Sequence, residues 1–161
     1  MAAGREIERK FLVNRVPDGV DWSSEESLRQ GYVALDGDTE VRIRRGDAPG
    51  GTVTVKQGGG RSRVEEEMEV DERQAESLWE LTRGRRVEKV RRRTDVQGYQ
   101  AEVDEYRGDL SGMVVAEVEF PDDSAAGAFE PPGWFGREVT DDPAYKNRRL
   151  ATHGRPEEKD R

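Results

Sequence analysis

The chain has 161 residues, of which 39% are charged and 32% hydrophobic, and its formal net charge is −8. The acidic total argues against broad nucleic-acid binding, although clustered Arg and Lys leave room for a local basic site. The absence of cysteine excludes disulfides, thiolate metal sites and a cysteine nucleophile. No signal-like segment opens the sequence and no apolar run has membrane length, so we expect a cytoplasmic protein with no membrane partner.

The apolar residues fall in short regular runs, which predicts one strand-rich domain over 1–161, with a core at about 4–152 and a disordered tail at 153–161. Several segments alternate charged and apolar side chains with the two-residue period of a β-strand. In chain order, the predicted strands are 6–11, 30–35, 40–44, 52–56, 63–70, 87–94, 99–106 and 113–120. Asp-Gly at 36–37 and the glycines at 58–60 predict hairpin turns.

Helix signals interrupt these strands. The predicted helices are a short one at 24–29, a longer one at 72–82, a helical turn at 124–129 and a last helix through 142–150. Asp71 and Gln74 have the spacing of a capping box at the start of the longer helix. Asp142 as a cap, with Pro143 at the first helical position, predicts the start of the last helix.

Charged residues share one phase of each predicted strand. The acidic members are Glu6, Glu8, Glu65, Glu67, Glu102, Asp104, Glu117 and Glu119. The basic members are Lys10, Arg42, Arg44, Lys56, Lys89 and Arg91. A flat sheet could carry them on a wet face, with helices over its apolar face. A closed antiparallel barrel would instead turn them into a lumen and place the helices outside. We favour closure, because both signs of charge occur in pairs across the strands.

Paired carboxylates and bases suggest a specific chemistry. Packed carboxylates repel one another unless cations lie between them, and oxygen-only clusters suit Mg²⁺ or Mn²⁺. Arg and Lys opposite them suit phosphate groups. A lumen with carboxylates on one wall and Arg and Lys on another is therefore predicted to hold a polyphosphate beside divalent ions.

Ordered motifs carry these residues. They are E-x-E-x-K at 6–10, Q-G-Y at 30–32, V-R-I-R at 41–44, T-V-K at 54–56, R-x-E-x-E at 63–67, V-D-x-Y at 103–106, A-E-V-E at 116–119, W-x-G-x-E-V-T at 134–140 and Y-x-N-x-x-L at 145–150. In this order they resemble the CYTH superfamily, also called triphosphate tunnel metalloenzymes, over roughly 4–152. Arg9 and Glu66 depart from the pattern, because they place charges on the phase that should face the helices.

The resemblance implies an α+β fold, with a closed eight-stranded antiparallel β tunnel and outer helices, that binds a small-molecule triphosphate with Mg²⁺ or Mn²⁺. The metal ligands it implies are Glu6, Glu8, Asp104, Glu117 and Glu119. The implied substrate-binding residues are Lys10, Arg42, Arg44, Lys56, Lys89, Arg91 and Lys146, the last closing the tunnel from the last helix. The implied catalytic residues are Lys10, Glu65, Glu67, Glu102 and Tyr32, which position the bases, assist a second metal or lie near the substrate.

The function expected first is an inorganic triphosphatase, a monomer or homodimer that cleaves tripolyphosphate to pyrophosphate and phosphate. The enzyme alternatives are a thiamine triphosphatase, a nucleoside triphosphatase and a class IV-type adenylate cyclase. An alternative of another class is a non-catalytic polyphosphate-binding module, but the chain retains all its acidic pairs. Nucleic-acid binding through residues 91–93 is a weaker alternative.

Overall fold

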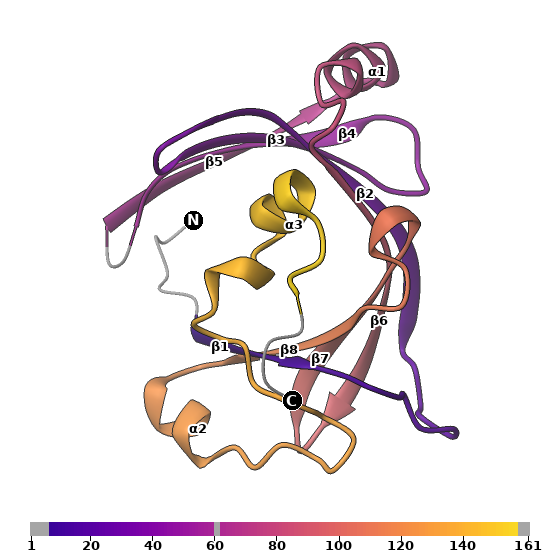
Figure 1. Cartoon of the computed structure of the whole chain (residues 1–161), viewed down its shortest axis with the longest axis vertical. Coiled ribbons are helices and arrows are strands. Elements are labelled where there is room, and N and C mark those ends of the chain that lie inside the picture. Colours follow the sequence, from indigo (N-terminus) through magenta and orange to yellow (C-terminus); the bar gives the residue numbers. More distant parts are fainter. Residues whose placement is uncertain (1–6, 60–61, 158–161) are drawn as a thin grey trace.

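A single eight-stranded antiparallel sheet forms most of the computed structural model, which describes residues 7–59 and 62–157 (Figure 1). The strands are β1 Ile7–Leu12, β2 Ser24–Asp36, β3 Thr39–Arg45, β4 Gly51–Gly59, β5 Ser62–Val70, β6 Arg86–Val96, β7 Tyr99–Tyr106 and β8 Val114–Phe120. The helices are α1 Glu72–Glu80, α2 Asp123–Ala128 and α3 Asn147–His153, with 3₁₀ turns η1 Gly108–Leu110 and η2 Pro143–Tyr145. None of the described helices is long and apolar enough to cross a membrane. The predicted α+β class and the eight antiparallel strands are confirmed.

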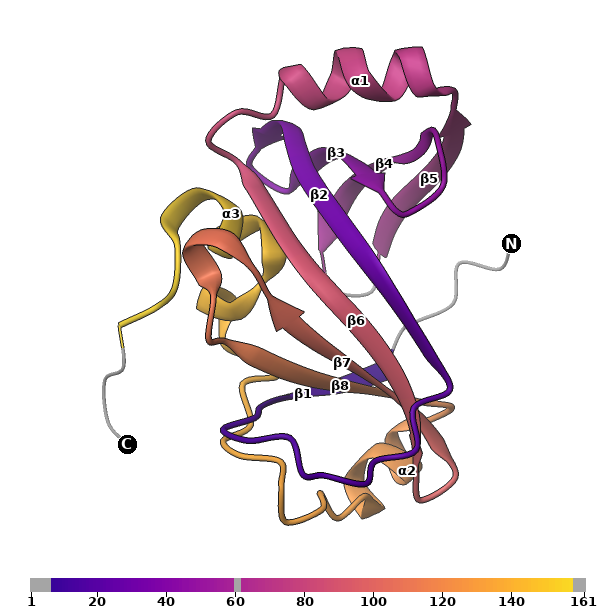
Figure 2. The same ribbon diagram turned by 90° about the vertical axis from the view of Figure 1, so that its right-hand side faces the viewer.

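The sheet is curved but open. Its strand order is β1-β8-β7-β6-β2-β3-β4-β5, so β1 and β5 are the two edges, and no ladder joins them within the described part of the chain. Figure 1 shows the sheet curling around α3, and Figure 2 shows β2 and β6 running side by side as the long strands at its middle. The predicted closure of the sheet into a barrel is therefore not found.

The edge of β1 is occupied by a later segment, which gives a physical reason for the opening. The amide of Leu12 donates to the carbonyl of Arg137 at 2.9 Å, and the amide of Val139 donates to the carbonyl of Lys10 at 2.8 Å. Phe11 and Glu138 form an antiparallel bridge between these bonds. Because each backbone group on this edge already has a partner, this part of β1 has none left for β5.

The first helix packs on the convex, apolar face of the sheet. Ala75 of α1 is fully buried in a cluster with Ile43 of β3 and Val53 of β4. The predicted capping box is present: the Asp71 carboxylate accepts from the amide of Gln74 at 2.8 Å, and the Gln74 side chain accepts from the amide of Asp71 at 3.0 Å. Burial of the apolar stripe and satisfied terminal amides together fix this helix in place.

Arg9, whose charge departs from the strand pattern, has its partners on the convex face. Its guanidinium forms a two-point ion pair with Glu138, at 2.9 and 2.8 Å. It also donates to the carbonyls of Ala126 and Phe129, at 2.8 and 3.0 Å. Arg9 thus holds the end of α2 against β1, which is the exterior pairing that a charge on this phase requires.

The third helix lies on the concave face, so the prediction that all helices pack outside is wrong for α3. Leu150 and Tyr145 are buried in a cluster with Tyr32, Val87 and Tyr106 of the sheet. Tyr106 lies directly opposite Lys89 in the β6–β7 ladder, so this cluster shares a face with the charged residues. The charged phase becomes apolar toward one end of these strands, and α3 covers that end.

The predicted helix at 24–29 is also wrong, because these residues are the first half of β2. They pair with β6 in an unbroken ladder from Ser24 opposite Arg93 to Gly31 opposite Arg86. Leu28 is 5% exposed, whereas its sequence neighbours Ser27 and Arg29 are exposed, which is the alternation of a strand. Tertiary pairing with a long neighbouring strand outweighs the local helix signal here.

Candidate active site

Strand register brings the predicted charged residues onto one face. Lys10 lies opposite Glu117, and Glu117 lies opposite Glu102 on its other side. Asp104 lies opposite Arg91 in the next ladder. Because directly opposite residues project from the same side of a sheet, these side chains form one continuous charged surface on the concave face.

A buried ion-pair cluster lies at the middle of this surface. Asp104 Oδ1 is 2.7 Å from Arg91 Nε, and Oδ2 is 3.0 Å from Arg91 Nη2. Lys89 Nζ is 2.9 Å from Asp104 Oδ2. The side chains of Lys89, Asp104 and Arg91 are only 1%, 8% and 12% exposed. Two cations therefore share the Asp104 carboxylate in a water-poor environment, and Glu102 is a second, more distant partner of Arg91, at 3.4 Å.

The pKa directions follow from this arrangement. Burial disfavours the Asp104 carboxylate, but Lys89 and Arg91 outweigh it and hold the pKa of Asp104 well below its usual range. Burial lowers the pKa of Lys89, although Asp104 opposes this shift. Burial also acts to lower the pKa of Arg91, but its bonds to Asp104 outweigh that effect and raise it. Asp104 is thus ionised at neutral pH and serves as the counter-ion of the cluster.

A second group of bases continues the surface across β2 and β3. Arg42 Nη1 is 3.0 Å from Glu40 Oε2, and the Nε of Arg42 is buried without a hydrogen-bond partner in the described structure. Arg44 Nε donates to Gln30 Oε1 at 3.1 Å, and Gln30 Nε2 donates to the Tyr32 hydroxyl at 2.8 Å. An arginine held by a neutral amide keeps its charge available to an incoming anion, whereas the buried Nε of Arg42 would need a local rearrangement to reach one.

Electrostatics at this end also favour an anion. Burial lowers the pKa of Arg44, and repulsion from Arg42 and Arg91 adds to the shift. Burial, with the charge of Glu40, raises the pKa of Tyr32 to about 12, so its hydroxyl keeps its proton at neutral pH. A bound anion would relieve the repulsion among these arginines.

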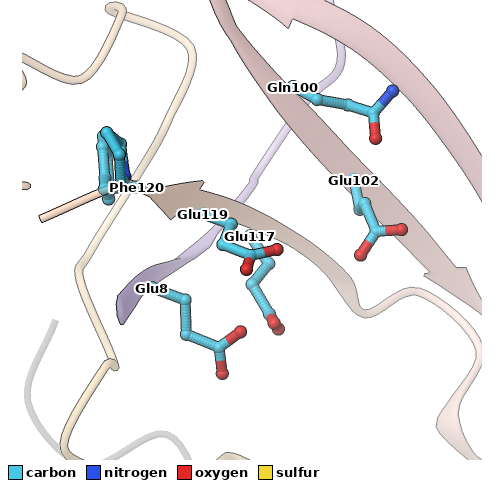
Figure 3. A pocket seen from close by; sticks show the side chains of 7 residues that line it. Glu8, Gln100, Glu102, Glu117, Glu119 and Phe120 are labelled. Atoms are coloured by element: carbon cyan, nitrogen blue, oxygen red, sulfur yellow. The ribbon is translucent and has the colours of Figure 1, made fainter. Parts of the chain in front are cut away.

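A cavity of about 350 Å³ opens beside the bases and has an acidic wall. Its charged lining residues are Glu8, Glu102, Glu117 and Glu119. In Figure 3, Glu8, Glu117 and Glu119 project from neighbouring strands into the same space, and Glu102 faces it from β7. The structure therefore brings three of the predicted metal ligands together with one predicted catalytic carboxylate.

Lys10 connects the acidic wall to the C-terminal segment. Its Nζ is 3.9 Å from Glu117 Oε2 and donates to the carbonyl of Tyr145 at 3.3 Å. The hydroxyl of Tyr106 donates to Asn147 Oδ1 at 2.7 Å. Polar contacts from the charged face thus anchor η2 and the start of α3.

Other predicted site residues have no ion pair with this network in the described part of the chain. Glu65 and Glu67 lie on the edge strand β5, opposite Lys56 and Thr54. Lys146 is exposed between η2 and α3, and no ion pair joins it to another described residue within 4 Å. Glu6 falls outside the described residues, so the predicted set of metal ligands is incomplete here.

The sequence alternative of a polyanion site at residues 91–93 loses its basis. Arg91 and Arg93 face the concave surface and pair with acidic residues, whereas Arg92 lies on the other face. The guanidinium of Arg92 stacks 4.4 Å from the centre of the Trp22 ring and lies 3.6 Å from Glu105. The three arginines therefore do not form one basic patch.

Two contacts that shape the site were missed from the sequence. Arg93 Nη2 is 2.9 Å from Glu102 and its Nη1 is 3.1 Å from Glu26, so Arg93 orients one wall of the cavity. Glu26 was missed because residues 24–29 were assigned to a helix. Gln30 was missed because a neutral side chain on a charged phase carries no sequence signal, although it lies in the Q-G-Y motif.

The donors that line the cavity fit a divalent ion by their chemistry. Four carboxylates and no Lys or Arg line it, and hard oxygen donors are what Mg²⁺ and Mn²⁺ prefer. Within residues 7–59 and 62–157, no three acidic or histidine side chains yet converge closely enough to enclose an ion. Water and substrate oxygens would complete the coordination of an ion bound by these carboxylates, as is common at Mg²⁺ sites.

Known proteins are similar to this chain in sequence and in fold. An inorganic triphosphatase of Nitrosomonas europaea is 47% identical over 151 residues, which cover 91% of this chain and 96% of that protein. An inorganic triphosphatase of Acetivibrio thermocellus is 39% identical over 153 residues, covering 91% and 93%. The crystal structure of the inorganic triphosphatase NE1496 superposes with a TM-score of 0.77 at 42% identity, covering 95% of this chain and 98% of that one.

More distant structures share the fold alone. A Hippeastrum protein described as a putative adenylyl cyclase with a dominant triphosphatase activity gives a TM-score of 0.55 at 18% identity, covering 76% of this chain and 83% of that one. The family model of the CYTH domain matches residues 4–138. The chain therefore belongs to the CYTH family, as its ordered motifs predict.

Proposed function

We propose that this protein is an inorganic triphosphatase, which hydrolyses tripolyphosphate to pyrophosphate and phosphate. The observation that carries the proposal is the placement of a buried cluster of bases next to a cavity walled by carboxylates, on one face of one sheet. Similarity to two inorganic triphosphatases over nine-tenths of the chain supports the same substrate class.

The bases suit a short polyphosphate. Lys89 and Arg91 share Asp104 as their nearest carboxylate, and the buried Nε of Arg42 has no partner among the described residues. Arg44 adds a guanidinium that no described carboxylate neutralises within 4 Å. Guanidinium groups bind phosphate oxygens through two parallel hydrogen bonds, so these residues would grip and orient the substrate.

The acidic wall would hold the metal. Glu8, Glu117 and Glu119 are the proposed ligands among the described residues, with Glu102 beside them. A divalent ion bound there would supply charge neutralisation of the phosphates and a lowered pKa of bound water. Glu102, held by Arg93 at 2.9 Å, is placed to accept a proton from a water molecule near the wall. Lys10, between Glu117 and the carbonyl of Tyr145, would bind the substrate oxygens nearest this wall.

The remaining sequence assignments stay predictions. They are the roles of Glu6, Glu65, Glu67, Lys56 and Lys146, the metal role of Asp104, closure of the sheet around the substrate, the choice between Mg²⁺ and Mn²⁺, a cytoplasmic location, and a monomer or homodimer. The acidic cavity favours catalysis over polyphosphate binding alone, because binding requires only the bases.

Phosphate release by the pure protein tests the proposal. Tripolyphosphate, ATP and thiamine triphosphate would be compared side by side with Mg²⁺, with Mn²⁺ and with a chelator. We expect fast, metal-dependent release from tripolyphosphate and slow release from the other two. Cyclic AMP and pyrophosphate formed from ATP, or no turnover of any substrate, would overturn the proposal in favour of a cyclase or a binding module.

A further inference from the structure

Gln30 is a buried neutral residue among the bases of the proposed site. It is 1% exposed and lies on β2, opposite Arg44 of β3 and Val87 of β6. Its carboxamide contacts Arg44 through one end, at 3.1 Å, and Tyr32 through the other, at 2.8 Å. Both neighbours are assigned to the substrate site, whereas Gln30 itself is not.

The chemistry of its partners fixes the orientation of the amide. A guanidinium only donates hydrogen bonds, so the oxygen of Gln30 must face Arg44 and its NH₂ must face Tyr32. The hydroxyl oxygen of Tyr32 therefore accepts from Gln30, and its proton points elsewhere. No described residue provides an acceptor for that proton within hydrogen-bond distance, so a substrate oxygen that reaches this 1%-exposed side chain would be its acceptor.

Gln30 also sets the charge balance at Arg44. Most other bases on this face lie within 4 Å of a carboxylate, namely Lys10, Arg42, Lys89, Arg91 and Arg93, whereas Lys56, next to the edge strand β5, has no such pair with a described residue. Arg44 forms no such pair with a described residue, and a neutral amide holds its Nε instead. A glutamate in place of Gln30 would be nearly identical in shape, but it would neutralise Arg44 and would accept the proton of Tyr32.

We propose that Gln30 is a positioning residue for phosphate binding: it orients Arg44 and directs the Tyr32 proton toward the anion, while leaving the charge of Arg44 uncompensated. This inference rests on the proposed function for the identity of the anion, an inorganic tripolyphosphate. It assigns a neutral residue to the recognition of a highly charged substrate, because neutrality is what keeps the neighbouring guanidinium available.

The test measures tripolyphosphate affinity and stability for the same variants. Titration calorimetry without metal gives the affinity, so that binding is separated from turnover. Gln30→Glu should weaken binding by about 10- to 100-fold, because the new carboxylate would pair with Arg44 in place of the phosphate. Gln30→Met should weaken it by about 3- to 10-fold. Gln57→Glu, at an exposed position of β4, makes the same change of charge and should bind like the unsubstituted protein.

Melting of the unliganded variants separates positioning from a structural role. Gln30→Glu should melt at the same temperature as the unsubstituted protein or higher, because it gains an ion pair with Arg44, while it binds tripolyphosphate more weakly. Unchanged affinity in Gln30→Glu, or no binding by the unsubstituted protein, would overturn the inference. Weakened binding together with an unsubstituted protein that releases no phosphate would support the inference and overturn only the proposed hydrolysis.

Discussion

The carboxylate of Asp104 forms a two-point ion pair with the guanidinium of Arg91, with Oδ1 2.7 Å from Nε and Oδ2 3.0 Å from Nη2. Lys89 occupies the second oxygen as well, at 2.9 Å. Lys89 and Arg91 together contact both oxygens and leave little lone-pair capacity for a metal, so the geometry favours a role in orienting the bases. The acidic cavity is lined by other carboxylates.

Replacing Asp104 by asparagine should destabilise the protein strongly. The change keeps the side-chain shape but leaves Lys89 buried without a counter-ion and Arg91 with only the longer, 3.4 Å pair to Glu102, a loss of about 3–5 kcal/mol in typical cases. Urea unfolding monitored by circular dichroism measures this loss. Addition of tripolyphosphate should restore part of it, because the anion replaces the missing charge. Unfolding at the same urea concentration as the unsubstituted protein would contradict the counter-ion role.

The same pair predicts how stability depends on pH. The pKa of Asp104 is lower in the folded protein than its unfolded value of about 3.9, so folding favours the ionised form. Its contribution is therefore fully present above pH ~4 and is lost as the pH falls through the lower folded-state pKa. Thermal melts between pH 7 and pH 2 should show this fall, and Asp104→Asn should show a shallower one. Parallel curves for the two proteins would rule the explanation out.

The sequence predicts the strands of this fold well, because the two-residue alternation of charged and apolar side chains is a local signal. All eight predicted strands lie in the observed sheet, although residues 24–29 extend β2 where a helix was expected. The open edge could not be predicted in this way. It results from residues 136–139 bonding to β1, a contact across more than a hundred positions that leaves no periodic pattern.

The site shows the same division. Residue type and strand phase predicted which bases and carboxylates lie on the concave face, because charges buried in such number need partners of opposite sign. Strand phase alone could not show that Asp104 forms ion pairs with Lys89 and Arg91, nor that α3 covers one end of the same face. Both depend on the length of the side chains and on the path of the C-terminal segment.

Arg44→Lys should weaken substrate binding without changing the chemical step. Lysine keeps the positive charge but has no Nε–H to donate to Gln30 and cannot bind a phosphate through two parallel bonds. We expect KM for tripolyphosphate to rise by about 10-fold with kcat nearly unchanged. Steady-state phosphate release measures both constants. Arg83→Lys, at a side chain that is 76% exposed, is the matched control. A fall in kcat at constant KM would instead show that Arg44 stabilises the transition state.

Arg9→Ala should lower stability and leave turnover intact. The variant loses the two-point pair with Glu138 and the bonds to the carbonyls of Ala126 and Phe129, on the face opposite the site. Hydrogen bonds to charged groups contribute about 1.5–3 kcal/mol each when partly buried, so a loss of about 2 kcal/mol is a conservative expectation. Chemical unfolding measures it, with phosphate release as the second measurement. A raised KM at normal stability would show that this pair acts on the site.

Glu119→Gln should abolish metal-dependent turnover while sparing the fold. Glu119 is exposed on β8, lies opposite Glu8 and lines the acidic cavity, so its charge repels its neighbours until a cation is bound. Removing that charge should leave the unliganded protein as stable as before or slightly more stable, and should reduce phosphate release by at least about 100-fold. The rise in melting temperature on adding Mn²⁺ should shrink as well, because a ligand is lost. Glu76→Gln, at an exposed position of α1, makes the same change away from the cavity and should retain turnover and the Mn²⁺ response. If Glu119→Gln keeps both, the metal does not bind at this wall and the carboxylates serve only to balance the bases.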